Sequence, residues 1–253
     1  MSKNFGNSAR FYDLIYKDKD YAAETHFVCD RINRFATDVK TLLEVGCGTG
    51  NYAYRFRDAG LKVHGIDASS EMISIAMDKK SSLGGENITF EVSNAEEFST
   101  SNSWDSAVSL FFMLGYQVSD EDLHKTFNSI RTAIRPGGLF AFDFWHGPSV
   151  LEKGCCPKKI EIEMQNHFLV RESIPEKCSG QNCFRIQQSF QVEEKDGGKK
   201  QYFEEVHKVR YFFREELQEV IQTNGFELLG MEAFMGGDLE ATNWAGIAFA
   251  RAR

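Results

Sequence analysis

Between residues 41 and 146, the chain alternates short, mostly apolar runs with segments whose apolar residues recur at helical spacing. Apolar runs of this kind are typical of strands buried on both faces of a parallel sheet. The helical segments between them are suited to cross from one such strand to the next. We interpret five runs as consecutive strands of one sheet: residues 41–45, 61–67, 88–94, 104–112 and 134–143.

The segments outside this region have other patterns. Residues 8–37 carry apolar side chains at helical spacing and predict a helical cap before the first strand. Apolar and polar positions alternate in residues 155–213, which predicts an inserted antiparallel sheet with one face exposed to solvent. Residues 196–198 predict a hairpin-type turn within it. We therefore expect a single α/β domain over residues 1–253 that carries both elaborations.

The last part of the chain predicts one more helix and two more strands. The helix begins at Arg214 and ends at Gly225, a residue type that favours helix ends. Residues 226–234 and 244–250 then have the composition of strands, and we expect them to form an antiparallel pair. Added to the five runs above, they make a sheet of seven strands.

The first predicted strand leads into a turn with glycine at every second position, at Gly46, Gly48 and Gly50. Glycine permits unusual dihedral angles and close approach of a ligand to the backbone. The turn opens into a helical segment, so a ligand can lie at a helix N-terminus. Dinucleotide-binding folds use G-x-G-x-x-G, and here the third glycine comes one residue early, which argues against a dehydrogenase. Glu44 precedes the turn, where it can pair with a cationic ligand.

The pattern acidic-x-G-x-G-x-G resembles the first motif of the class I S-adenosylmethionine (SAM) dependent methyltransferases. Later elements match this family in order: Asp67 after the second strand, Asn94 after the third, and the Pro-Gly-Gly turn at residues 136–138 before the fifth. The resemblance implies a Rossmann-like sheet of seven strands with helices on both faces. It also implies SAM as methyl donor and S-adenosylhomocysteine as product.

Ligands of open α/β sheets lie outside the carboxyl ends of the strands, so we expect SAM to lie there. Asp67 is placed to accept both ribose hydroxyls, and Asn94 stands where the family usually has an Asp that binds the adenine amino group. We expect Cys47 to be a small filler of the loop and not a nucleophile. The cofactor-binding residues that we predict are Tyr21, Glu44, Gly46, Cys47, Gly48, Gly50, Asp67, Ala68, Met72, Asn94, Ala95, Glu96, Leu110 and Phe111.

Methyl transfer from a sulfonium needs orientation and a nucleophile with a free lone pair, so a nearby base helps an amine or a hydroxyl to react. His146 is one candidate base, in residues 143–148, which combine an acid, an imidazole and two aromatic rings; the alternative is a structural hydrogen bond. His207 is the other, because it shares a strand face with Glu205. The alternative for this pair is a solvated face that includes Lys208.

The N-terminal segment sharpens the resemblance. Residues 12–16 and 20–24 read Y-D-x-x-Y and D-Y-A-A-E, which is similar to the opening of the sugar N,N-dimethyltransferases of bacterial deoxyaminosugar pathways. The Gly-Tyr pair at residues 115–116 and an inserted sheet with the triplet at residues 205–207 also match that group. The resemblance implies that Tyr16 faces the acceptor amine and that Tyr21 faces the amino-acid end of SAM.

The acceptor stays open, because Trp145-His146 stands where that group often has Trp-Trp. We favour the amine of a nucleotide-linked aminosugar. The alternatives are a small-molecule O-methyltransferase, an N-methyltransferase for glycine-like amines, and a SAM-binding protein without turnover. A sugar nucleotide requires cations for its diphosphate, and the inserted region supplies Lys158, Lys159, Arg171 and Arg185.

Composition limits the partners and the location. The net charge of −8 over 253 residues argues against nucleic acid, whose binding depends on Lys and Arg. We see no apolar run that would span a bilayer and no apolar core of a signal peptide, and we expect a cytoplasmic protein. The six cysteines are then expected to be thiols, and no motif calls for a metal. The expected partner is a small-molecule substrate, and a homodimer is compatible with the sequence.

Overall fold

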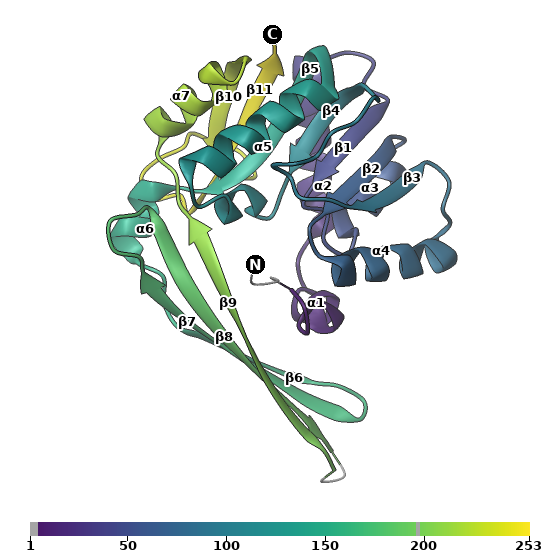
Figure 1. Ribbon diagram of the computed structural model, residues 1–253, viewed down its shortest axis with the longest axis vertical. Coiled ribbons are helices and arrows are strands. Elements are labelled where there is room, and N and C mark those ends of the chain that lie inside the picture. The colour runs from purple at the N-terminus through teal and green to yellow at the C-terminus, as the bar shows by residue number, and fades with distance from the viewer. Residues whose placement is uncertain (1–4, 196–197) are drawn as a thin grey trace.

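The structure is a computed structural model that describes residues 5–195 and 198–253 (Figure 1). The strands of its larger sheet are β1 (Thr41–Val45), β2 (Lys62–Asp67), β3 (Ile88–Val92), β4 (Trp104–Ser109), β5 (Ile134–Trp145), β10 (Phe226–Ala233) and β11 (Ala245–Ala252). They lie in the order β10-β11-β5-β4-β1-β2-β3. β1 to β5 are parallel, whereas β11 is antiparallel to both β5 and β10. The predicted fold class and the antiparallel C-terminal pair are confirmed.

Helices cover both faces of this sheet, and β1 shows why they must. Its neighbouring residues Leu42 and Leu43 are fully buried, yet they point to opposite faces and join different hydrophobic clusters. A strand that is apolar on both faces needs cover on both. The covering helices are α2 (Tyr21–Phe35) and α3 (Asn51–Asp58) on the Leu42 face, and α5 (Asp120–Ala133) and α7 (Arg214–Thr223) on the Leu43 face.

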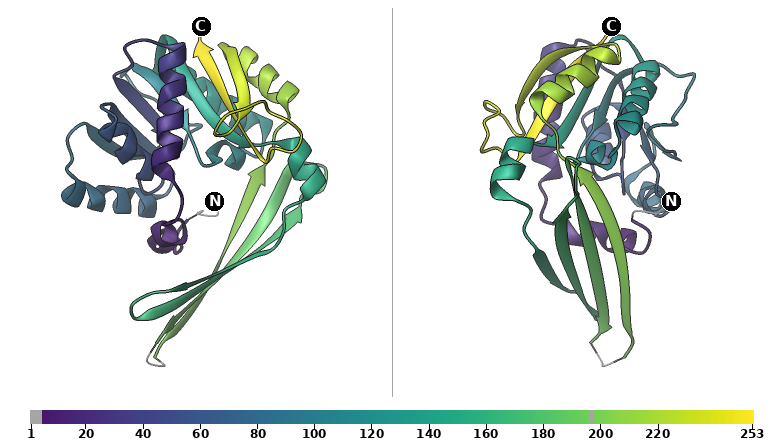
Figure 2. Two further views of the ribbon diagram at one scale, coloured as in Figure 1. Left: turned by 180° about the vertical axis from the view of Figure 1, so that it is seen from behind. Right: turned by 60° about the vertical axis from the view of Figure 1, so that its left-hand side comes forward.

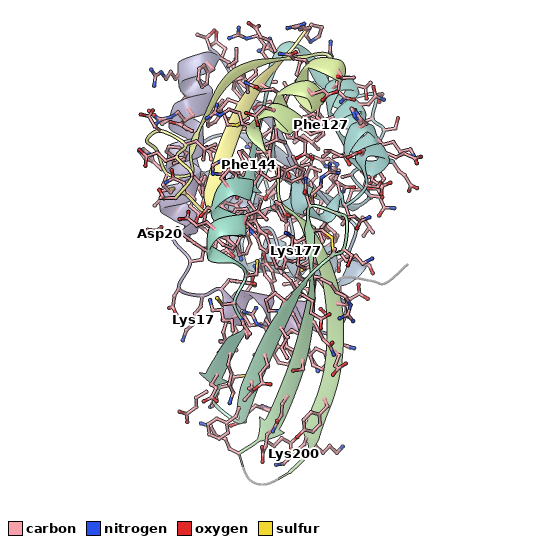
Figure 3. The ribbon with its side chains drawn as sticks, turned by 90° about the vertical axis from the view of Figure 1, so that its left-hand side faces the viewer. Lys17, Asp20, Phe127, Phe144, Lys177 and Lys200 are labelled. Carbon is pink, nitrogen blue, oxygen red and sulfur yellow. A yellow bond between two sulfur atoms is a disulfide. The ribbon has the colours of Figure 1, made fainter. Side chains whose placement is uncertain are left out.

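The inserted region forms a second, antiparallel sheet in the order β6-β7-β8-β9. It follows α6 (Gly147–Lys153) and extends away from the larger sheet as a long, narrow ribbon (Figures 1 and 2). Its strands are β6 (Lys158–Glu163), β7 (His167–Lys177), β8 (Cys183–Glu194) and β9 (Lys200–Arg210). Lys200 lies near the far tip of this sheet, whereas Phe127 and Phe144 lie at the other end of the molecule (Figure 3). The predicted turn at 196–198 includes residues 196–197, which are outside the described residues.

Two short helical elements lie near the place where the two sheets approach each other. α1 (Ala9–Ile15) lies beside the gap between the larger sheet and the inserted one (Figures 1 and 2). The 3-10 helix η1 (Met113–Tyr116) follows β4, which ends at Ser109 and not at residue 112 as expected. The strand stops early because Phe111 and Phe112 have positive φ angles, which turn the chain out of the sheet.

The expectation that all six cysteines are thiols is wrong for two of them, because Cys178 and Cys183 form a disulfide. These residues flank the short turn between β7 and β8, where the backbone N–H of Cys178 donates to the carbonyl of Cys183 over 2.9 Å. Their Cα atoms are 5.4 Å apart, within the range that a disulfide spans. The turn between the two cysteines was visible in the sequence. The pairing of β7 with β8, which brings the two cysteines together, was not.

In the described residues, no helix is long and apolar enough to cross a membrane.

Candidate active site

A cavity of about 1090 Å³ opens between the carboxyl ends of β1, β2 and β4, helix α1 and the inserted sheet. Its size is at the upper end of the range for small-molecule sites, which suits a cofactor together with a second ligand. One part of its wall, here called the cofactor half, comes from the strand ends of the larger sheet. The other part, the acceptor half, comes from β6 to β9, Trp145 and Trp244.

The glycine turn forms the floor of the cofactor half with backbone atoms. Gly46 and Gly48 line the cavity, and both have positive φ angles. A Cβ at position 46 would lie 2.1 Å from Cγ of Met113, so only glycine fits there. The N–H groups of Gly46 and Cys47 both donate to the carbonyl of Ile66, over 2.8 and 2.9 Å, which fastens the turn to β2.

Asp67 joins the glycine turn to the next helix and presents its carboxylate to the cavity. One carboxylate oxygen accepts the N–H of Gly48 and the other that of Ser69, each over 2.8 Å. Ser69 in turn caps α4 (Ser70–Leu83) by accepting the N–H of Met72. Burial raises the pKa of Asp67 above its ordinary value, although both N–H groups oppose that shift. The carboxylate is thus held in the wall of the cavity by two backbone N–H groups.

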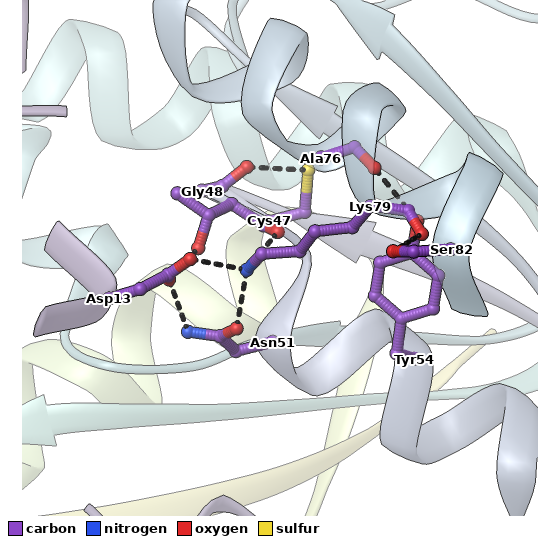
Figure 4. A network of polar contacts seen from close by, with 9 residues as sticks. Asp13, Cys47, Gly48, Asn51, Tyr54, Ala76, Lys79 and Ser82 are labelled. Atoms are coloured by element: carbon purple, nitrogen blue, oxygen red, sulfur yellow. Dashed lines mark hydrogen bonds and ion pairs between the residues drawn. The ribbon is translucent and has the colours of Figure 1, made fainter. Parts of the chain in front are cut away.

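Asp13 fastens α1 to the glycine turn (Figure 4). Its carboxylate accepts hydrogen bonds from Oγ1 of Thr49 over 2.6 Å and Nδ2 of Asn51 over 2.9 Å, and it forms an ion pair with Lys79 at 2.7 Å. Burial raises the pKa of Asp13, but these three donors outweigh burial and hold that pKa below its ordinary value. The N-terminal helix is therefore attached to the cofactor half by a charged network.

Asp143, which the sequence analysis placed with the substrate, instead holds the loop after β4. Its buried carboxylate accepts the N–H groups of Phe111 and Phe112 over 2.9 and 2.7 Å. Burial raises its pKa to about 7, against the effect of the two N–H groups. Two consecutive aromatic residues with positive φ are strained, and such strain persists only where the surroundings impose it. Asp143 imposes it here, and the loop places both rings on the cavity wall.

Most of the predicted cofactor-binding residues do line the cavity: Gly46, Gly48, Asp67, Ala68, Met72, Asn94, Ala95, Glu96, Leu110 and Phe111. Four do not, namely Tyr21, Glu44, Cys47 and Gly50. Cys47 and Gly50 belong to the glycine turn, Glu44 to β1 and Tyr21 to the start of α2. Glu44, Cys47 and Gly50 are buried, and Tyr21 is half-buried.

The four residues outside the lining have structural contacts. Glu44 is buried within β1, and burial raises its pKa. Cys47 fills the space beside Gly65, where a Cβ would lie 2.8 Å from its Sγ. Gly50 has no room for a side chain, because a Cβ would lie 2.9 Å from the ring of Phe90. Tyr21 packs on the ring of Tyr52, with centroids 4.9 Å apart, and burial raises its pKa to about 12.

The three predicted catalytic residues have different surroundings. Tyr16 and His207 line the cavity, whereas His146 does not. His146 is 5% exposed and its Nδ1 lies 3.2 Å from the carbonyl oxygen of Asn243. Burial lowers its pKa, because the charged form is penalised there. His146 therefore lies outside the cavity, because the antiparallel neighbour β11 and the segment before it close over the end of β5, and its catalytic role stays a prediction.

The residues that the sequence analysis missed come mainly from the acceptor half and the N-terminal segment. The Gly-Tyr pair after the fourth strand indicated Tyr116, but no sequence pattern indicated Phe5 or Trp244. Neither belongs to a motif, and both reach the cavity only through the tertiary fold. The additional lining residues that matter below are Phe5, Tyr12, Tyr116, Trp145, Lys158, Arg171, Ser173 and Trp244.

Comparison with known proteins agrees with this geometry. Residues 42–138 match the methyltransferase domain family. With the sheet order, the glycine turn and the cavity at the strand ends, this match supports a SAM-dependent methyltransferase with the class I fold.

Curated relatives extend the likeness beyond that domain. The chain is similar to dTDP-3-amino-3,4,6-trideoxy-alpha-D-glucopyranose N,N-dimethyltransferase of Streptomyces venezuelae, at 24% identity over 90% of this chain and 94% of that protein. It is also similar to dTDP-3-amino-3,6-dideoxy-alpha-D-glucopyranose N,N-dimethyltransferase of Streptomyces fradiae, at 24% identity over 92% of this chain and 87% of that one.

Solved structures share the whole fold. The Streptomyces venezuelae protein DesVI superposes with a TM-score of 0.80 at 22% identity and covers 97% of this chain and 98% of its own. The SAM-bound amino pentose methyltransferase CalS10 of Micromonospora echinaspora superposes with a TM-score of 0.74 at 19% identity and covers 100% and 99%. Structures at these identities support the fold, including the inserted sheet.

Proposed function

We propose that this enzyme transfers a methyl group from SAM to the amine of a nucleotide-linked aminosugar. The observation that carries the proposal is Arg171, a cation in the wall of the acceptor half that is only 6% exposed. Among the described residues it has no ion pair; its Nη1 donates to the hydroxyl of Tyr16 over 3.2 Å, and its Nε has no hydrogen-bond partner. A buried charge without a counterion is costly, so an anionic ligand would stabilise this site.

Two neighbours of Arg171 extend the same anion-binding surface. Ser173 lies on the same face of β7, two residues further along, and its buried hydroxyl has no hydrogen-bond partner among the described residues. Lys158 of β6 stands directly opposite Ser173 in the register and also lines the cavity. A guanidinium, an ammonium and a hydroxyl together suit the oxygens of a diphosphate.

The other two predicted cations do not share this position. Lys159 pairs with Glu161 at 2.7 Å and Arg185 with Glu176 at 3.6 Å, and neither lines the cavity. The prediction of a basic patch is thus reduced to Lys158 and Arg171.

Tyr16 stands where the two halves meet, which supports the role that we propose for it beside the acceptor amine. Its ring packs on Phe111 of the cofactor half, with centroids 4.9 Å apart, while its hydroxyl meets Arg171 of the acceptor half. Trp145 and Trp244, with ring centroids 5.6 Å apart, add flat apolar surface against which a sugar or a base can stack. The relatives that span nearly the whole chain are named for dTDP-aminosugar substrates, which supports the same acceptor.

The test is a methylation assay with SAM and four acceptors: a dTDP-linked aminosugar, the same aminosugar without nucleotide, dTDP-glucose, and glycine. We expect S-adenosylhomocysteine and a methylated product by mass spectrometry with the first, and a KM at least about tenfold higher without the nucleotide. Methylation of dTDP-glucose would indicate an O-methyltransferase, and methylation of glycine alone would indicate the amino-acid alternative. SAM binding without turnover on any amine or hydroxyl would favour a binding protein.

The proposal also includes the setting in which the enzyme works. We propose a cytoplasmic enzyme that acts on a small-molecule acceptor, either as a monomer or as a homodimer. Light scattering on the purified protein distinguishes the two oligomeric states.

A further inference from the structure

We propose that Tyr116 is the residue that accepts the proton of the acceptor amine, and that it passes its own hydroxyl proton to His207, which Glu205 orients. The inference rests on the proposed amine acceptor and goes beyond it, because it assigns the proton transfer to one hydroxyl. Of the polar contacts that His207 makes, the one to Tyr116 leads to the cavity wall, since Glu205 is not part of that wall.

The fold brings these three residues together through a glycine. Gly115 packs directly against β9, where an added Cβ would lie 2.8 Å from Cγ1 of Val209 and 3.0 Å from the carbonyl oxygen of Arg210. The absence of a side chain lets η1 approach β9 closely. As a result, the hydroxyl of Tyr116 lies 3.2 Å from Nδ1 of His207.

Glu205 is the charged group beside Nε2 of His207, an atom that has no hydrogen-bond partner among the described residues. It lies 3.5 Å from Nε2 of His207 and accepts two hydrogen bonds from Ser8, over 3.0 Å from the N–H and 2.6 Å from the hydroxyl. Burial raises the pKa of Glu205, but these donors and His207 outweigh burial, so the group is an anion. A carboxylate at Nε2 favours the tautomer with its proton there, which leaves the lone pair of Nδ1 for Tyr116.

The pair is shielded from water by the N-terminal segment. His207 is 1% exposed, and the ring of Phe5 lies 4.8 Å from its imidazole and 5.8 Å from the ring of Tyr116, centroid to centroid. Phe5 is itself held by a hydrogen bond of 3.2 Å from the hydroxyl of Ser69, at the start of α4. The segment therefore connects the cofactor half to the buried histidine, and the hydroxyl of Tyr116 offers a proton path from the cavity to its Nδ1.

The proposed step balances in protons and charges. The acceptor ammonium gives one proton to the oxygen of Tyr116, as the O–H proton of Tyr116 moves to Nδ1 of His207. The products are a neutral amine and an imidazolium beside the carboxylate of Glu205. Burial raises the pKa of Tyr116, so its hydroxyl works as a relay and not as a standing anion. The amine lone pair then attacks the methyl carbon of SAM, and the electrons of the C–S bond leave with the sulfur.

The titratable groups around this pair are Glu205 on β9, Tyr12 on α1, Tyr16 directly after α1, and Asp67 at the end of β2. All but Glu205 also line the cavity. The carboxylate of Glu205 lies beside the imidazolium that the step forms.

The test measures kcat against pH for Tyr116→Phe and Glu205→Gln, with His146→Gln as a control at a buried histidine outside the cavity. For Tyr116→Phe we expect a loss of about 100-fold at pH 7 with SAM affinity unchanged. That loss should shrink as pH rises past the pKa of the amine, because the acceptor then enters already neutral. For Glu205→Gln we expect the acid limb of the profile to move, and for His146→Gln no change in its shape.

The outcomes separate the relay from the function on which it rests. A Tyr116→Phe enzyme whose pH profile parallels that of the wild type would overturn the relay, while product formation would still support the amine acceptor. Absence of amine methylation by the wild type at every pH would overturn both. Unchanged SAM affinity shows that the variants are folded, and Glu205→Gln tests the same path without touching the cavity wall.

Discussion

The two halves of the cavity are built by different means. In the cofactor half, backbone atoms of the glycine turn and one carboxylate, Asp67, form a surface whose parts lie close together in sequence. In the acceptor half, side chains such as Arg171, Trp145 and Trp244 come from strands and loops far apart along the chain. A backbone surface recognises what every SAM-dependent methyltransferase shares, whereas a side-chain surface can change with the substrate while the fold stays the same. The contrast predicts that substitutions in one half will leave binding in the other unchanged.

The largest effect is expected in the cofactor half, for Asp67→Ala. The substitution removes the acceptors of the Gly48 and Ser69 N–H groups and the proposed contact with the ribose, so SAM affinity should fall by about 3 kcal/mol, on the order of 100-fold. Calorimetric titration with SAM and S-adenosylhomocysteine measures it. Asp20→Ala, at the exposed cap of α2, is the control for loss of an acid. Equal SAM affinity in wild type and Asp67→Ala would show that this carboxylate does not contact the cofactor.

The next largest effect is expected in the acceptor half, for Arg171→Met. Loss of the guanidinium should weaken binding of the nucleotide-linked acceptor by about 1.5–3 kcal/mol. The KM for that acceptor should rise accordingly, while SAM affinity stays the same. Steady-state kinetics with varied acceptor concentration measure the KM, and calorimetric titration measures the SAM affinity. Arg185→Met is the matched control, because that arginine lies outside the cavity and pairs with Glu176. A parallel loss in both variants would mean that the inserted sheet responds to charge in general and that no anion site exists at Arg171.

Asp143 holds the loop after β4, and its titration predicts a pH dependence of stability. Burial raises its folded pKa to about 7 from an ordinary value near 3.8, so the unfolded state releases the proton first. The contribution of Asp143 to the free energy of unfolding should therefore be fully present below about pH 4. It should be lost progressively as pH rises through about 7, by an amount on the order of 1–3 kcal/mol. Asp143→Asn should remove this dependence between pH 4 and 7.

The measurement for Asp143 is urea unfolding of wild type and variant across that pH range. Asp105→Asn is a useful comparison, since Asp105 is a partly buried acid whose donors, led by the N–H of Lys40 and the guanidinium of Arg135, outweigh burial and lower its pKa. Its contribution should run in the opposite direction, being lost as pH falls below its ordinary pKa. Parallel curves for wild type and Asp143→Asn would mean that Asp143 does not titrate in this range.

The smallest effect is expected for His146→Gln. The imidazole lies within hydrogen-bond distance of the Asn243 carbonyl and does not reach the cavity. We expect a loss of about 1 kcal/mol in the free energy of unfolding and an unchanged kcat. A large fall in kcat without a change in stability would support His146 as a catalytic group and would place part of the acceptor site at the end of β5.

Much of the cofactor half was predictable because its chemistry is local. The apolar runs and the glycine turn lie within consecutive residues, and the strand ends follow from the rule that parallel strands end at one edge. Four residues predicted for that half, Tyr21, Glu44, Cys47 and Gly50, do not line the cavity. Orientation within a turn depends on dihedral angles, and a residue pattern does not specify those.

The acceptor half and the proton path were predictable only in fragments. Tyr16, Arg171 and His207 were candidates, yet nothing local to them showed that Tyr16 meets Arg171 or that Tyr116 meets His207. His146 was chosen because it follows a strand end, and it lies outside the cavity because the segment at Asn243 covers it.

By itself, the sequence of this protein determined the parallel sheet and its glycine turn, since each follows from hydrophobic periodicity or from backbone freedom at adjacent positions. The use of SAM was inferred from the resemblance of that turn, and of the elements after it, to a known family. The tertiary structure alone decided which distant side chains share the cavity, which cysteines pair and which histidine is reachable. The physical reason is that such contacts depend on how the inserted sheet and the N-terminal segment fold over the strand ends. That packing is a property of the assembled chain, and no short run of residues encodes it.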